Sequence, residues 1–239
     1  MNLWASFGRD LVDQWPLIMR GLGASLSLTV IISITGFLLG IVVFYLRHCP
    51  VAWVRMLIRG YISFFIGMPL IVLLFLMYYG LPQWGVKMTP FVVAVIGFTF
   101  NVAAYNAAYL NTAYNGLDPA EIEAARSQGF GPLHIFRLIT LPQVLRLSVP
   151  ALTNQVIRNL KDSSVAYLIQ YNEFFVRVQE LAATNFMFFH AYLFAAVVYL
   201  ALISVVVMVA RRIERRVMIP GVLNDALPVP DVVVRATTV

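Results

Sequence analysis

Several ionisable side chains stand in an otherwise apolar stretch between residues 147 and 170. Charged groups are costly inside a membrane, so they usually pair with one another or face a water-filled pathway. Arg158 and Asp162 are four positions apart, so on a helix they share a face and could neutralise each other. Alternatively, this face lines the pathway of a solute that carries both ammonium and carboxylate groups. The candidate pathway residues of this stretch are Asn154, Arg158, Lys161, Asp162 and Ser163.

A second set of polar side chains lies between residues 90 and 114, which carry no charge. Asn101, Tyr105 and Asn111, with the position of Ala108 between them, are candidates for the same pathway. Asparagine also forms hydrogen bonds between packed helices of a membrane bundle, and for any single asparagine that packing role is the better interpretation. Both interpretations require the stretch to be a helix that crosses the membrane.

Other kinds of chemistry have no motif in this sequence. There is no GxxxxGK[ST] loop for ATP phosphates, no HExxH and no GxSxG. His48, His134 and His190 lie in different segments, and Cys49 is the one cysteine, so we expect neither a metal site nor a disulfide. The net charge of +6 comes with no basic patch interleaved with aromatic residues, so no nucleic-acid partner is expected. If the chain works in an ATP-driven complex, hydrolysis is expected on another polypeptide.

The composition indicates an all-α integral membrane protein. Hydrophobic residues make up 61% and charged residues 12% of the 239 residues, whereas soluble domains have about 45–50% and 25%. Because a span needs about 20 mostly apolar residues, five spans are predicted. They cover residues 21–46, 61–81, 90–114, 147–170 and 187–210.

The positive residues predict the orientation. Cytoplasmic loops collect Lys and Arg, and five spans place the two termini on opposite sides. Arg211, Arg212, Arg215 and Arg216 follow the last span, so the C-terminus is expected in the cytoplasm and the N-terminus outside. Residues 1–16, with Trp4 and Trp15, are expected to form a short interfacial helix. Residues 217–239 are expected to be a loose cytoplasmic tail.

A polar insert, residues 115–146, separates the third and fourth spans on the predicted cytoplasmic side. Asp118 is a plausible N-cap with Pro119 at the first helical position. Gly129 and the Gly131-Pro132 pair should end this first short helix, and a second helical piece should run to Pro142. By itself, the insert could be an amphipathic surface helix that joins two spans.

The insert resembles the EAA motif of ABC-importer permeases. The sequence reads Glu123-Ala124-Ala125, three residues, Gly129, nine residues, Ile139, one residue, then Leu141-Pro142. The resemblance implies a coupling helix that docks on a separate ATPase subunit. The docking residues it implies are Glu121, Glu123, Ala124, Ala125, Gly129, Leu141 and Pro142.

Residues 17–216 resemble the polar amino-acid permeases, which import histidine, arginine, glutamine, glutamate and opines. Three further elements carry this resemblance: residues 67–70 (GMPL), 79–82 (YGLP) and 160–164 (LKDSS). It implies the transmembrane domain of a type I importer in a bacterial cytoplasmic (inner) membrane. The implied partners are two ATPase subunits with their ATP and Mg, a second permease chain in a homo- or heterodimer, and an extracytoplasmic solute-binding protein.

This sequence departs from the family where charge is usual. The family's Tyr-x-x-Glu-x-x-Arg reads Tyr105-x-x-Ala108-x-x-Asn111 here, and its Arg-Gly-Thr-Pro begins with Ile66. Either the binding face of this chain is altered, or the chain is the non-binding half of a heterodimer. Three other functions remain open: a secondary transporter or channel that does not use ATP, an ABC permease for another solute, and a scaffold without a pathway.

Overall fold

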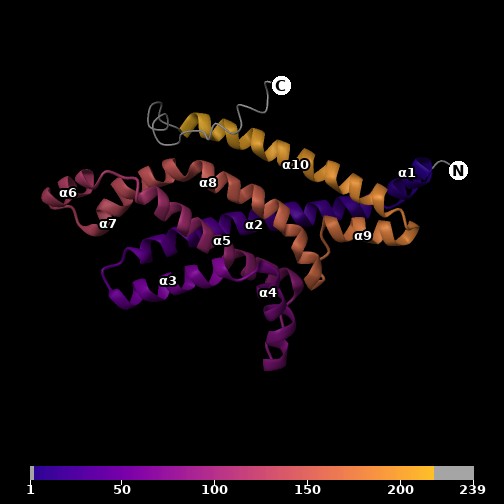
Figure 1. Cartoon of the computed structure of the whole chain (residues 1–239), viewed down its shortest axis with the longest axis horizontal. Coiled ribbons are helices and arrows are strands. Elements are labelled where there is room, and N and C mark those ends of the chain that lie inside the picture. The colour runs from indigo at the N-terminus through magenta and orange to yellow at the C-terminus, as the bar shows by residue number, and fades with distance from the viewer. Residues whose placement is uncertain (1–2, 218–239) are drawn as a thin grey trace, which may run out of the picture.

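The computed structural model describes residues 3–217, and its long elements are helices that run lengthwise in one bundle (Figure 1). A short helix α1 (Leu3–Asp13) lies near α9 (Phe174–Asn185) at one end, and α6 (Pro119–Ser127) and α7 (Pro132–Ile135) lie at the other. The membrane-length helices are α2 (Trp15–Arg47), α5 (Pro90–Tyr114), α8 (Leu141–Asp162) and α10 (Phe188–Val217).

Glycines allow α2 to lie unusually close to α5. A Cβ atom added to Gly36 would come within 2.5 Å of Val102 Cγ1, and one added to Gly40 would come within 2.8 Å of Asn106 Cβ. Small residues permit such close backbone approach in membrane bundles, where van der Waals packing drives association. The α2–α5 pair therefore forms the centre of the bundle, and α8 packs against both helices.

The predicted second span is not one straight helix. Helix α3 (Ala52–Gly67) ends before Pro69, and α4 (Leu70–Phe75) continues at 102° to it through a π turn (Leu76–Gly80) and a 3₁₀ turn (Leu81–Trp84). Proline disfavours the helical conformation of the residue before it, and Met68 is extended, with φ −90° and ψ 130°. Among the described helices, four could each cross a membrane, or five if the bent pair counts as one span.

The fourth span is continuous with the polar insert. The α7 helix passes through a π turn (Phe136–Thr140) into α8, and a 3₁₀ turn (Ser163–Ile169) follows, so residues 132–169 are helical throughout. Pro142 has no N–H to donate to the preceding turn, and the π turn lies immediately before α8. The predicted fourth span, residues 147–170, is thus the C-terminal part of a longer helical segment. The second helical piece that was expected in the insert is the N-terminal part of the same segment.

The N-terminal segment forms the predicted short helix. In α1, Phe7 is buried against Ile18 and Phe174, whereas Trp4 is exposed. This end of the bundle lies opposite to the α6–α7 insert (Figure 1). That arrangement agrees with the three spans that were predicted between the N-terminal helix and the insert. The predicted tail, residues 217–239, lies outside the described residues apart from Val217.

Candidate coupling surface and solute pathway

Helix α6 begins as its sequence predicts. The Asp118 carboxylate accepts a hydrogen bond from the Ala120 N–H at 2.9 Å, and Pro119 occupies the first helical position. Glu121 lies in the first turn, where the positive end of the helix dipole favours an acidic side chain. Glu121 also accepts a 2.6 Å hydrogen bond from Gln143 Nε2, which ties α6 to the start of α8.

Helix α6 ends in a turn that requires glycine. The Gly129 N–H donates to the Arg126 carbonyl and the Phe130 N–H donates to the Ala125 carbonyl, which is the Schellman pattern of a helix C-terminus. Gly129 adopts φ +84°, in the left-handed region that side chains with a Cβ avoid. The glycine of the EAA spacing therefore has a backbone role, and Phe130 turns away from the end of α6.

The predicted docking residues divide into two groups. Ala125 is buried, and Leu141 and Pro142 are half-buried, so these residues hold the insert against the bundle. Glu123, Ala124 and Gly129 are exposed, as is Glu121, which is held by Gln143. Three large apolar side chains that the sequence did not single out are exposed beside them, and Leu138 is 64% exposed. We call the exposed set the coupling surface: Glu123, Ala124, Gly129, Phe130, Leu133 and Leu138.

Aromatic packing anchors the insert to the end of α2. The His48 ring lies 4.9 Å from the Phe44 ring and 4.4 Å from the Tyr114 ring, and its Nδ1 lies 3.0 Å from the Phe44 carbonyl oxygen. Burial lowers the pKa of His48, which favours its neutral form. Phe136 of the π turn also contacts Phe44 and Tyr45. This cluster fixes the insert relative to α2 and α5.

The structure brings Arg158 and Tyr105 together. The Arg158 guanidinium carbon lies 5.1 Å from the centre of the Tyr105 ring, within the range of a cation–π interaction. No ion pair within 4.0 Å joins Arg158 to Asp162, so the pairing suggested by their spacing is not formed. Arg158 is exposed and Asp162 is half-buried, and Asp162 is the last residue of α8. Arg158 therefore has no carboxylate within ion-pair distance in the described part of the chain, although Asp162 is near enough for the two charges to interact.

The other predicted pathway residues differ in their surroundings. Asn101 Nδ2 donates to the Phe65 carbonyl at 2.9 Å, which ties α5 to α3 just before the break. The Ser163 hydroxyl donates to the Leu160 carbonyl and is buried. The Asn101 bond joins two helices, as the packing interpretation of a single asparagine describes, whereas the Ser163 bond stays within its own helical turn. Asn154 and Lys161 are exposed, and Ala108 and Asn111 are half-buried.

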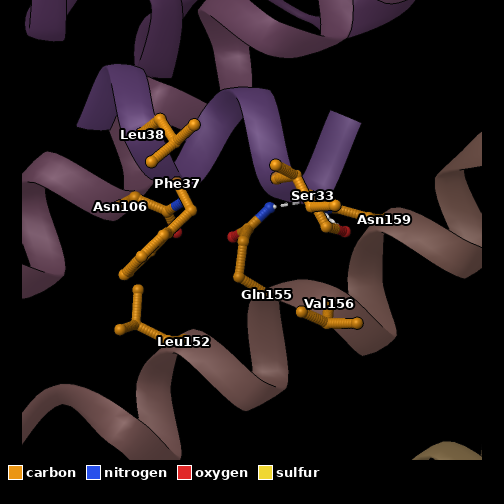
Figure 2. A pocket seen from close by; sticks show the side chains of 9 residues that line it. Ser33, Phe37, Leu38, Asn106, Leu152, Gln155, Val156 and Asn159 are labelled. Atoms are coloured by element: carbon orange, nitrogen blue, oxygen red, sulfur yellow. Dashed lines mark hydrogen bonds between the residues drawn. The ribbon is translucent and has the colours of Figure 1, made fainter. Parts of the chain in front are cut away.

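A buried polar network that joins α2, α5 and α8 was not identified from the sequence. Gln155 Nε2 donates to Asn159 Oδ1 at 2.9 Å, and Asn159 Nδ2 donates to Ser33 Oγ at 2.9 Å (Figure 2). The Tyr109 hydroxyl lies 3.4 Å from Gln155 Oε1. The signal in the sequence is the amide pair at positions 155 and 159, which share a helix face.

A buried carboxylate between α2 and α9 was also missed. The Glu173 side chain caps α9 by accepting hydrogen bonds from the Phe175 and Val176 N–H groups, and it accepts a third from the Ser25 hydroxyl. Burial raises the pKa of Glu173 to about 7. The Ser25–Glu173 bond therefore connects α2 to the start of α9, at the end of the bundle opposite to the insert.

These features define a class: a helical subunit that crosses a membrane and carries an exposed polar insert. Residues 34–219 match the family described as the binding-protein-dependent transport system inner membrane component, and the chain belongs to that family. The predicted ABC-importer permease is thereby confirmed, as a multi-pass inner-membrane subunit and not an ATPase. The secondary-transporter, channel and scaffold alternatives are set aside.

Named relatives are permeases. The chain is 33% identical over 192 residues to a probable amino-acid ABC transporter permease protein, PatM of Vibrio harveyi, covering 79% of this chain and 86% of that protein. It is 32% identical over 219 residues to the L-cystine transport system permease protein TcyB of Bacillus subtilis (strain 168), covering 90% and 94%.

Solved structures share the fold. One described as an amino acid ABC transporter with histidines has a TM-score of 0.79 and 28% identity, covering 86% of this chain and 96% of that chain. An inward-facing MetNI methionine ABC transporter has a TM-score of 0.71 at 20% identity, covering 87% and 99%, and shows the fold alone.

Proposed function

We propose that this chain imports an amino acid and that it itself contacts the solute. The complex would contain a second permease chain, two ATPase subunits and an extracytoplasmic binding protein. The N-terminus would be outside and the C-terminus in the cytoplasm, a topology supported by the Lys and Arg distribution. The names of the relatives, for an amino acid and for L-cystine, support the solute class.

The ATPase would dock on the coupling surface. Exposed apolar side chains beside small residues offer an area that a soluble partner can bury, and Leu133 and Leu138 border the same groove together with His134 and Arg137. ATP and Mg²⁺ would bind to the ATPase, because this chain has no phosphate-binding loop. Nucleotide-driven closure would then move the coupling surface.

Arg158 carries the proposal for the solute. A guanidinium stacked on the Tyr105 ring keeps its orientation while its edge N–H groups remain able to bind a carboxylate in two hydrogen bonds. Arg158 is exposed in this chain, so its guanidinium is accessible, and the carboxylate of an entering amino acid would pair with it. Asp162, which lies four positions further along the chain, would face the solute's ammonium group.

Uptake by the assembled importer in proteoliposomes tests this assignment. We expect Arg158→Gln to raise the KM for solute by about 10- to 150-fold, which corresponds to the loss of one charged hydrogen-bonded contact, about 1.5–3 kcal/mol. Arg158→Lys keeps the charge but lacks the planar guanidinium, so its KM should lie between those of the unsubstituted chain and Arg158→Gln. Lys87→Gln is the control, because Lys87 is an exposed cation outside the described helices. A normal KM for Arg158→Gln would assign solute binding to the second permease chain.

A further inference from the structure

A stripe of polar side chains runs along one face of α8. Asn154, Arg158 and Lys161 are all exposed and follow one another at spacings of four and three residues, so they share one face of the helix. Charged side chains of a membrane-spanning helix avoid lipid and face the bundle interior or a water-filled pathway. A solute that meets Arg158 would therefore meet Lys161 on the same face.

Neither cation of this stripe has a carboxylate at close range. No ion pair within 4.0 Å joins Arg158 or Lys161 to an acidic group in the described part of the chain. Asp162 is half-buried beside them, and the charges of both Arg158 and Lys161 act on its carboxylate. Because residues 158–162 span only about 6 Å along the helix axis, these three side chains form one group. We call Arg158, Lys161 and Asp162 the charge triplet.

The neighbouring spans supply no carboxylate to the charge triplet. The sequence has no acidic residue between Asp13 and Asp118, so α2, α3, α4 and α5 contain none. Glu214 lies in the last turn of α10, at the end of that helix opposite to α9. Glu173 is buried and already accepts three hydrogen bonds. The charge triplet, with two cations and one carboxylate, therefore keeps a net charge of +1.

An acidic amino acid has the opposite set of charges. It carries two carboxylates and one ammonium group, so each of its charges can face an opposite charge of the charge triplet. A neutral amino acid leaves one cation without a partner. A basic amino acid brings a second cation to a place that already holds two, and opposed like charges are unfavourable.

We infer that this permease selects an acidic amino acid and that Lys161 recognises its side-chain carboxylate. Arg158 binds the α-carboxylate and Asp162 faces the ammonium group, as in the proposed function, on which this inference rests. Lys161 then decides between an acidic amino acid and its uncharged amide. The lysine ammonium stands on a flexible four-carbon stem, so it can reach the side-chain carboxylate of either aspartate or glutamate.

Binding of labelled L-glutamate and L-glutamine tests the inference, because the two solutes have nearly the same size and differ by one charge. The assay uses the assembled, nucleotide-free importer in lipid nanodiscs, without the extracytoplasmic binding protein, so that only the membrane complex discriminates. Glutamate should bind about fivefold more tightly than glutamine, as a partly solvated charge pair provides. Equal affinity for the two solutes, or tighter binding of L-lysine than of glutamate, would overturn the inference.

Two substitutions on α8 separate this inference from the proposed function. Lys161→Gln should reduce the glutamate-to-glutamine preference to about one and leave glutamine affinity intact, which also reports that the variant is folded. A preference that survives in Lys161→Gln would overturn the inference but not the proposed function. Arg158→Gln should weaken binding of both solutes, and unchanged binding would reject the proposed function and this inference with it. Lys87→Gln is the control, because Lys87 is an exposed cation outside the described helices, and both affinities should stay unchanged.

Discussion

Replacing Gly129 with valine should weaken docking of the ATPase through the backbone alone. Gly129 has φ +84°, and a Cβ atom added there would meet nothing within 4 Å. The substitution therefore introduces no clash within the described chain. What it opposes is the left-handed conformation that ends α6 and turns the chain toward Phe130.

The size of the effect follows from the cost of that conformation. A left-handed backbone costs an L-residue about 1–2 kcal/mol, and more when the side chain is β-branched. If this cost lowers the population of the docking conformation, affinity for the ATPase should fall about 5- to 30-fold. Asparagine tolerates the left-handed region, so Gly129→Asn should bind within about threefold of the unsubstituted chain.

The assay is binding of the purified ATPase subunit to the permease in lipid nanodiscs, together with ATP hydrolysis stimulated by the binding protein. Gly131→Val is the matched control, because Gly131 lies in the same insert with φ −70° and also has open space at the Cβ position. Normal affinity of Gly129→Val, or an equal loss in Gly131→Val, would refute the backbone argument.

Two further predictions concern stability, measured by thermal unfolding in detergent. Glu173 has a pKa of about 7 in the folded chain, against an ordinary value of 4.5. The unfolded chain therefore ionises at lower pH, and the free energy of unfolding should fall by about 3 kcal/mol as the pH rises from 4.5 to 7. Glu173→Gln should remove this pH dependence, and an unchanged dependence would reject the assignment to Glu173. Gly36→Ala should destabilise the fold by about 1–3 kcal/mol, because the added Cβ would overlap Val102. Gly23→Ala should be tolerated, since its Cβ meets no atom within 4 Å. Equal thermal unfolding midpoints for the two variants would contradict the close packing of α2 on α5.

Hydropathy and capping residues predict much of the fold. Residues 90–114 were expected as a span and form α5 with the same bounds, because an uncharged and mostly apolar run begins directly after the Thr89 N-cap. Asp118 and Gly129 similarly predict both ends of α6. The sharp turn at Met68–Pro69 was not predicted, because average hydropathy does not register the geometric effect of one proline.

The candidate site was predicted less well, because its contacts join distant parts of the chain. The four-residue spacing suggested that Arg158 pairs with Asp162, yet Arg158 lies over Tyr105 on another helix. Gln155 and Asn159 find Ser33 on α2, a partner 126 positions from Asn159. Periodicity shows which face a residue occupies, but which helix covers that face depends on tertiary packing.

One helical segment runs from residue 132 to residue 169, with a π turn at Phe136–Thr140 and Pro150 inside α8, and no loop interrupts it. Leu138 of the coupling surface and Arg158 lie on it 20 residues apart, about 30 Å along the axis. A tilt imposed at the Leu138 end therefore displaces Arg158 directly, without a loop to absorb the motion. The distance that Arg158, the proposed solute contact, moves would then depend on the point about which this segment rotates. A flexible glycine linker inserted between Leu138 and Arg158 would uncouple hydrolysis from transport.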